Sequence, residues 1–190
     1  MLSEKEMKTL KENIERYEGR VPHLYLDSRA FVTVGVGHLL SSVENAKILD
    51  FVTMTGEPAT ENMIAEEYQV ISTQEANRVA SYYQSFTQLR LSDSAIDQLT
   101  EKHIDSFYGE LKIIYSEFDS FPSDIKLALF DLIFNLGMTS LRKKWPKLNG
   151  CIASKDWVAA ADNCRRKGIA DERNEYVKAL LLSGANIDIA

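Results

Sequence analysis

The stretch from Glu18 to His38, EGRVPHLYLDSRAFVTVGVGH, decides the fold of the region around it. Gly19 ends a helical pattern, and Pro22 precedes the short run HLYL, which predicts a strand. The run FVTVGV is β-branched and alternates between two faces, which predicts a second strand. The turn-forming residues 27–30, DSRA, separate the two. We therefore expect a small β-hairpin directly after a helix.

Helical patterns lie on both sides of this hairpin. A capping box at Ser3–Glu6 predicts a helix over residues 4–17, and a second box at Ser72–Glu75 predicts a helix to about Phe86. Spacings of three and four predict a long amphipathic helix over 92–115. A buried helix is expected over 125–136, with an N-cap at Ser123 and a stop at Gly137. Two further helices are expected over 154–166 and over 171–183, the last followed by Gly184.

Composition limits the class of protein. The 190 residues are 45% hydrophobic with a net charge of -6, enough for one globular domain. Acids outnumber bases over residues 41–131, whereas bases outnumber acids over 141–178, a basic region that is either a solvated helix face or a contact for an anionic polymer. Overall acidity and the lack of a zinc finger or basic helix argue against nucleic acid. Cys151 and Cys164 fit no metal or disulfide pattern, so we expect free thiols. Neither a signal peptide nor a membrane span is expected.

Three polar side chains of the hairpin stretch could form a site. Glycoside hydrolysis needs one carboxylic acid to protonate the leaving oxygen and a second carboxylate to activate water or attack the sugar. Glu18 and Asp27 could be this pair, and the Thr33 hydroxyl could share the water with Asp27. Each residue also has an ordinary explanation: a solvated charge, a turn aspartate and a strand-forming threonine. The spacing by itself leaves both interpretations open.

The segment EGRVPHLYLDSRAFVTVGVGHLL resembles the active-site region of the T-even phage lysozymes and related endolysins, with Glu18, Asp27, Thr33 and His38 on the family pattern without a gap. The stretches LSDSAIDQLTEKHIDSFYGEL, LIFNLGMTSL and DERNEYVKALLLSG are similar to the linking helix, the central helix and the closing helix of that family. The resemblance covers most of the chain outside an insertion-like stretch at residues 41–90.

The resemblance implies a single lysozyme-like domain over residues 1–190, α+β and predominantly helical. A small N-terminal lobe with the hairpin and the insertion (about 13–91) would join a helical lobe (about 116–185) through the bridging helix 92–115. The N-terminal helix would pack on the helical lobe, and the cleft between the lobes would bind the glycan.

The implied activity is that of a muramidase, which hydrolyses the β-1,4 bond between N-acetylmuramic acid and N-acetylglucosamine in peptidoglycan, without a cofactor or a metal. Glu18 would be the general acid, and Asp27 with Thr33 would hold the attacking water in an inverting mechanism. Arg173 would support Glu18, Asn135 would bind the sugar chain, and Phe134 would lie by the cleft or in the core.

The sequence departs from the family at one partner. The family pairs the histidine at position 38 with an acid on the linking helix, but the ungapped position here is His103. Either Asp105 takes that role or the pairing is absent, and His38 is a supporting or purely structural residue. The insertion at 41–90 would be padding, a substrate determinant or a docking surface.

The biological setting is open between phage lysis and an antibacterial effector or bacteriocin. In either case a protein made in the cytoplasm would act on the cell wall after release or delivery by another system. We expect a monomer that binds bacterial peptidoglycan and does not insert into membranes, and an immunity protein could cover its cleft. The alternative is a catalytically inactive glycan-binding or interaction module on the same fold.

Overall fold

The computed structural model describes residues 2–187. In chain order its elements are α1 (Glu4–Glu18), β1 (Val21–Leu26), β2 (Val32–Gly35), β3 (His38–Leu39), α2 (Val43–Lys47), β4 (Phe51–Thr53), α3 (Glu61–Ser72), α4 (Ala80–Tyr83), η1 (Gln84–Phe86), β5 (Leu89–Leu91), α5 (Asp93–Ile114), η2 (Phe118–Ser120), α6 (Ser123–Leu136), α7 (Met138–Lys144), α8 (Pro146–Ala153), α9 (Trp157–Asp162) and α10 (Asp171–Ile187). The fold class is α+β and predominantly helical, as expected. Within residues 2–187, no helix is long and apolar enough to cross a membrane.

The chain divides into two compact units. We call Ile14–Lys102 the hairpin unit, and Met1–Asn13 with His103–Ala190 the helical unit. The boundaries between them fall inside α1 and α5. Each unit is described by itself.

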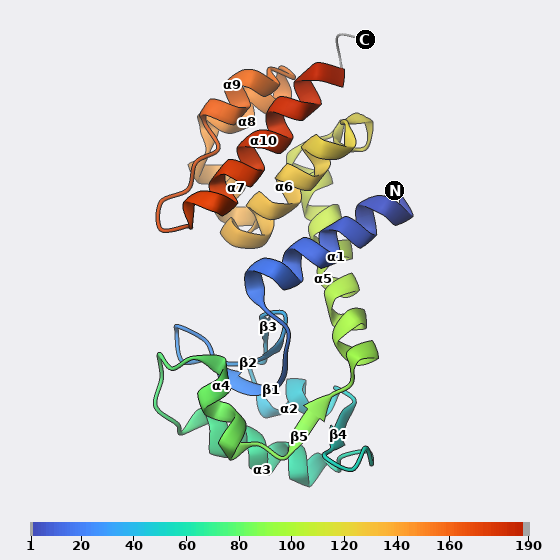
Figure 1. Ribbon diagram of the computed structural model, residues 1–190, viewed down its shortest axis with the longest axis vertical. Coiled ribbons are helices and arrows are strands. Elements are labelled where there is room, and N and C mark those ends of the chain that lie inside the picture. Colours follow the sequence, from blue (N-terminus) through green and yellow to red (C-terminus); the bar gives the residue numbers. More distant parts are fainter. Residues whose placement is uncertain (1, 188–190) are drawn as a thin grey trace. The chain divides into compact units, whose positions relative to one another are not determined.

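The predicted β-hairpin is confirmed in the hairpin unit. β1 and β2 pair antiparallel, with Tyr25 opposite Thr33 and an irregularity between Val21 and Tyr25, and β3 continues the sheet in the order β1-β2-β3. Gly37, in the turn between β2 and β3, has a φ of 88°, which explains a glycine there. All four residues of β2 are buried, so both faces of this strand are covered. Figure 1 shows α3 and α4 beside β1.

The prediction that a helix starts at Ser72 is wrong. That position ends α3, which begins at Glu61 after an N-cap at Thr60, whose hydroxyl accepts a hydrogen bond from the Met63 amide at 3.3 Å. The Ser72 hydroxyl instead donates to the Gln69 carbonyl at 2.8 Å. Asn77 then has a φ of 59°, which interrupts a helix, and only the short α4 and η1 follow.

α6 is the central helix of the helical unit, as predicted. It is buried at eight positions and ends at Leu136, with Gly137 as its C-cap, as expected. The predicted N-cap at Ser123 is wrong: Ser123 is the first helical residue, Pro122 takes the N-cap position, and the Ser123 hydroxyl donates to Glu6 Oε1. Figure 1 shows α10 running beside it, and α9 also packs against α10. The capping box at the start of α1 is confirmed: the Ser3 amide donates to Glu6 Oε2 at 2.7 Å, and the Glu6 amide donates to Ser3 Oγ at 3.2 Å.

Two expectations for the end of the chain need correction. The helix expected over 154–166 is the shorter α9, which begins after an Asp156 N-cap, and α7 and α8 were not predicted. Gly184 does not end the last helix, because α10 continues to Ile187. A Cβ on Gly184 would clash with the end of the Ile125 side chain, so this glycine allows α10 to approach α6 closely. Both cysteines are free, as expected.

Candidate active site

Glu18 is placed by the end of a helix. It is the last residue of α1, and the Gly19 amide donates to the Glu15 carbonyl at 3.0 Å. Gly19 has a φ of 78°, a conformation that glycine adopts without strain and that turns the chain into β1. The helix end and the strand therefore fix the backbone on both sides of Glu18, which is half-buried.

The residue after Glu18 and Gly19 ties this turn to the start of α5. The Arg20 guanidinium donates to Asp97 Oδ1 at 2.9 Å, to Asp93 Oδ1 at 3.2 Å and to the Asp93 carbonyl at 2.8 Å, and it also pairs with Glu15. All four residues belong to the hairpin unit. Our sequence interpretation missed this cluster, because nothing in the local pattern shows that residues more than 70 positions apart meet.

Asp27 organises the turn of the hairpin. Its Oδ1 accepts hydrogen bonds from the amides of Arg29 at 2.8 Å and Phe31 at 2.9 Å. The Asp27 amide donates to the Phe31 carbonyl at 2.9 Å, and the Ala30 amide donates to the Asp27 carbonyl at 3.0 Å. The ordinary explanation of Asp27 as a turn residue is thus correct for one of its oxygens. The other, Oδ2, has no hydrogen bond or ion pair within residues 2–187.

Thr33 lies in β2 and is 3% exposed. Its hydroxyl donates to the Phe31 carbonyl at 3.0 Å, so that hydroxyl can only accept a further hydrogen bond from a water molecule. Asp27 and Thr33 therefore bond to opposite sides of one residue, Phe31: the carboxylate to its amide and the hydroxyl to its carbonyl. The hairpin therefore has two hydrogen-bond acceptors, Asp27 Oδ2 and the Thr33 hydroxyl oxygen, within one short segment.

Both candidate carboxylates affect the same side chain, the phenol of Tyr25. Burial raises the pKa of the Tyr25 phenol to about 12, and the charges of Glu18 and then Asp27 add to this shift. The charges of both acids thus act on the same phenol. Tyr25 is also opposite Thr33 in the sheet. We call Glu18, Asp27 and Thr33 the hairpin site. The alternation along β1 could have suggested Tyr25, but we did not predict it.

The remaining predicted site residues are divided between the units. His38 is half-buried in β3, opposite Val34. His103 belongs to the helical unit, where burial lowers its pKa and its ring contacts Phe107 and Phe134, each at 6.4 Å between centroids. The pairing of His38 with a residue of α5, including the exposed Asp105, stays a prediction.

Arg173 is held by a buried aspartate of the helical unit. Its Nε donates to Asp131 Oδ2 at 2.9 Å, and Arg166 Nη1 donates to Asp131 Oδ1 at 2.6 Å. Phe134 and Asn135 are half-buried at the end of α6, and Phe134 also packs on Phe107. The expected roles of these residues beside the hairpin site stay predictions.

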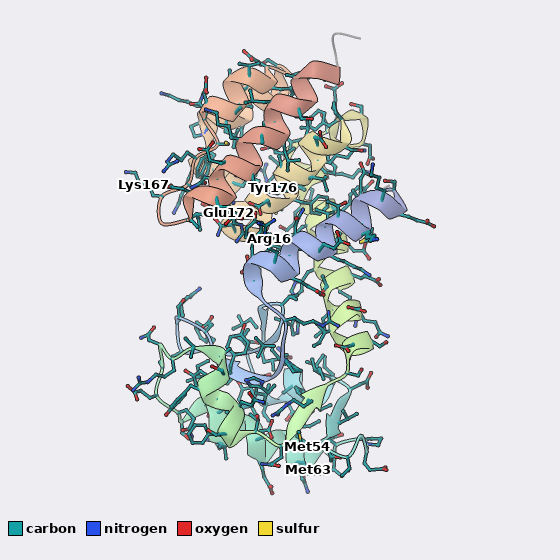
Figure 2. The ribbon with its side chains drawn as sticks, in the orientation of Figure 1. Arg16, Met54, Met63, Lys167, Glu172 and Tyr176 are labelled. Atoms are coloured by element: carbon teal, nitrogen blue, oxygen red, sulfur yellow. The ribbon has the colours of Figure 1, made fainter. Side chains whose placement is uncertain are left out.

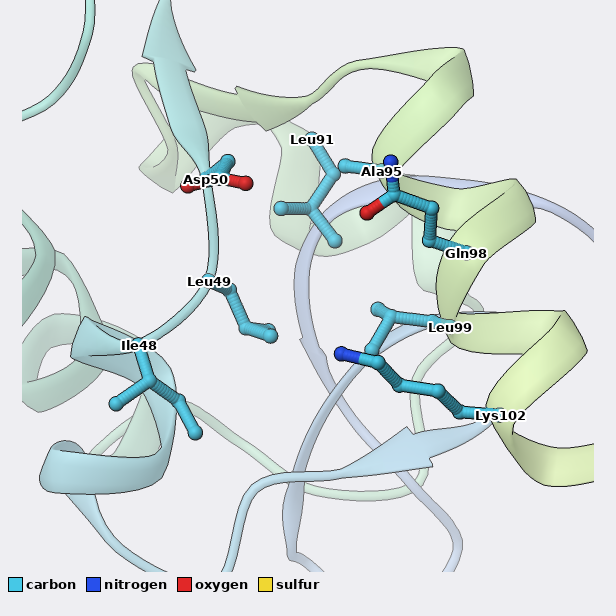
Figure 3. A pocket seen from close by; sticks show the side chains of 8 residues that line it. All are labelled: Ile48, Leu49, Asp50, Leu91, Ala95, Gln98, Leu99 and Lys102. Atoms are coloured by element: carbon cyan, nitrogen blue, oxygen red, sulfur yellow. The ribbon is translucent and has the colours of Figure 1, made fainter. Parts of the chain in front are cut away.

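A pocket of about 40 Å³ lies elsewhere in the hairpin unit. Asp50 and Lys102 lie at its edge, and the Lys102 side chain reaches across it towards Leu49 (Figure 3). One water molecule needs at least about 10–15 Å³ of such volume. The pocket therefore admits a few waters at most and is too small for a sugar ring.

The fold and the hairpin site define a mostly helical α+β protein with a pair of carboxylates beside a short antiparallel sheet. Within residues 2–187, no group of three or more histidine, cysteine, aspartate or glutamate side chains could hold a metal ion. No protein-family model and no curated protein matches the chain.

Proposed function

We propose that the protein is a peptidoglycan hydrolase that cleaves the β-1,4 bond between N-acetylmuramic acid and N-acetylglucosamine. The observation that carries the proposal is the hairpin site. Asp27 has one oxygen fixed by two backbone amides and a second oxygen without a partner within residues 2–187, and the charges of Glu18 and Asp27 both act on the Tyr25 phenol. The resemblance of residues 18–40 to the phage lysozymes supports this assignment.

In the proposed reaction, protonated Glu18 donates its proton to the glycosidic oxygen as the bond to the anomeric carbon breaks. A water molecule attacks that carbon from the opposite face. The water gives one proton to Asp27 Oδ2 and donates its other hydrogen bond to the Thr33 hydroxyl, whose own proton is held by the Phe31 carbonyl. An inverting mechanism needs about 6.5–9.5 Å between the two carboxyl groups. Arg173, His38, Asn135 and Phe134 would support Glu18 or the glycan.

The test is mass spectrometry of the fragments released from purified peptidoglycan by the wild type and by Glu18→Gln, Asp27→Asn and Glu12→Gln. Glu12 is an exposed acid of α1 and serves as the control. We expect reducing N-acetylmuramic acid ends from the wild type and Glu12→Gln, and a rate at least about 100-fold lower for Glu18→Gln.

Asp27→Asn sharpens the test, because the asparagine keeps an oxygen that can accept from Arg29 and Phe31 while it removes the charge. Loss of cleavage in a folded Asp27→Asn protein would therefore come from the chemistry. Anhydro ends would point to a lytic transglycosylase. If the wild type bound peptidoglycan and released nothing, the hydrolase proposal would be wrong, and a glycan-binding module would replace it.

The setting is part of the same proposal. A muramidase of this kind would serve in phage lysis or as an antibacterial effector or bacteriocin that reaches the wall by release or by another delivery system. An immunity protein would then be a partner of the enzyme.

A further inference from the structure

A second pocket of the hairpin unit lies in the insertion-like stretch and is separate from the hairpin site. It has a volume of about 280 Å³ and opens between α3 and the segment from η1 to β5. Three of its apolar side chains are unusually accessible: Met63 is 37% exposed, Val70 42% and Phe86 37%. Met63 is labelled in Figure 2, on α3. The pocket thus offers partly exposed apolar walls at the surface, against which an aliphatic chain could pack.

The polar part of this pocket includes two carboxylates, Glu66 and Glu67, that form no ion pair within residues 2–187. Glu67 is 7% exposed, and its Oε2 accepts hydrogen bonds from the amides of Gln88 and Leu89 at 2.5 and 3.0 Å. Its Oε1 is buried and has no hydrogen-bond partner within residues 2–187. Glu66 is exposed and makes no ion pair or hydrogen bond in the same part of the chain.

The cation whose charge acts on Glu67, Arg90, donates its hydrogen bonds to other groups. Arg90 lowers the pKa of Glu67 by its charge, but its Nη1 donates to Thr87 Oγ1 at 2.8 Å and to the Leu89 carbonyl at 2.6 Å. Burial is the larger effect and raises the pKa of the Glu67 carboxyl. A buried acceptor without a donor is unfavourable, and a donor brought by a ligand would relieve this.

We propose that this pocket is a docking site for a basic side chain, lysine or arginine, of a partner protein. The aliphatic stem of such a side chain would lie against Met63, Val70 and Phe86, and its charged head would bond to Glu66 and to Glu67 Oε1. Charge complementarity favours this occupant over a purely apolar one, because an apolar group would bury two carboxylates without a counter-charge. The Glu67 backbone contacts hold the carboxylate in place before the ligand arrives.

The test uses two peptides in ¹H–¹⁵N NMR titrations of the whole chain: acetyl-Leu-Lys-Leu-amide, and the same peptide with norleucine in place of lysine, which has the same stem without the ammonium. We expect saturable shifts at Met63, Val70, Phe86, Gln88 and Leu89 with the lysine peptide and at least about tenfold weaker binding of the norleucine peptide. Equal binding of the two peptides would overturn the proposal, as would the absence of saturation up to the solubility limit.

Variants distinguish binding of the lysine peptide in the pocket from its nonspecific attraction to acidic residues. Glu67→Gln should weaken binding of the lysine peptide about tenfold while its amide oxygen still accepts from Gln88 and Leu89. Glu66→Gln, at an exposed position, tests the same contact without risk to the fold. Glu61→Gln, on the same helix but outside the pocket, should bind as the wild type does. Equal weakening by Glu61→Gln would contradict the proposal. Peptidoglycan cleavage should be unchanged in Glu67→Gln, so this test is independent of the proposed activity.

Discussion

Replacement of Asp131 by asparagine should strongly destabilise the helical unit. The side chain of Asp131 is 7% exposed and forms ion pairs with two arginines, Arg166 at 2.6 Å and Arg173 at 2.9 Å, whose side chains are 1% and 9% exposed. Asn174 completes the cluster, because its Oδ1 accepts from the Arg166 amide at 3.0 Å and its Nδ2 donates to the Arg166 carbonyl at 3.0 Å. Asp131→Asn removes the negative charge that these two buried guanidinium groups share.

The expected loss follows from that burial. Removal of one partner from a buried ion pair costs about 3–5 kcal/mol, because the remaining charge is desolvated and uncompensated. Asparagine keeps one oxygen that can accept from an arginine, so we expect the lower end, about 3 kcal/mol. With a urea slope of about 1–3 kcal/mol per molar, the unfolding midpoint should fall by about 1–3 M.

Tryptophan fluorescence is the suitable assay, because the chain has two tryptophans, Trp145 and Trp157, and both belong to the helical unit. The matched control is Asp162→Asn, which breaks an exposed pair with Lys178 and should cost less than about 1 kcal/mol. If Asp131→Asn shifted the midpoint no more than this control does, the reasoning that the cluster is a desolvated charge network would be refuted.

Other variants test different parts of the structure. Gly184→Ala should destabilise the protein by about 1–3 kcal/mol because its Cβ would meet Ile125, whereas Gly109→Ala, a helix position with open space, should stabilise it by about 0.5–1 kcal/mol in the same urea assay. Since burial raises the folded pKa of Glu67 above its ordinary 4.5, the folded state binds the proton more tightly. Wild-type stability should therefore decrease relative to Glu67→Gln as pH rises from below 4.5 through the folded pKa, which urea unfolding followed by circular dichroism can measure; a constant difference would contradict this. The Tyr25 pKa of about 12 should fall, but stay above 10.0, when either acid of the hairpin site is replaced by its amide, as ultraviolet titration would show; an unchanged value would mean that the acids lie elsewhere.

The sequence predicted the parts of the fold that local patterns determine. Alternation and turn residues are enough to define β1, β2 and the turn at Asp27, because each depends on residues a few positions apart. The long helices α5 and α6 were predicted for the same reason, since many turns repeat one pattern.

The errors arose where one residue type has two uses. Ser72 and Glu75 match a capping box, but Thr60 caps the helix that forms. The donor to Thr60 is the backbone amide of Met63, and a backbone amide leaves no signal in the sequence. Gly184 matches a helix stop, yet it is a packing residue, because only the position of Ile125 in space requires a missing Cβ. Pro146 at the start of α8 was a usable signal that we overlooked.

Two aspartates, Asp27 and Asp131, differ in what their carboxylate oxygens can still bind. Asp27 and Asp131 are both aspartates with short hydrogen bonds, and residue type and local spacing do not distinguish their roles. In the structure, both oxygens of Asp131 are ion-paired with arginines, so this carboxylate has no oxygen left for a substrate or a water. Among the described residues, Asp27 accepts hydrogen bonds only through Oδ1, and the donors are backbone amides, which carry no full charge that would have to be displaced. A carboxylate that must take a proton from water needs such a fixed but incompletely used position, and of these two aspartates only Asp27 has it.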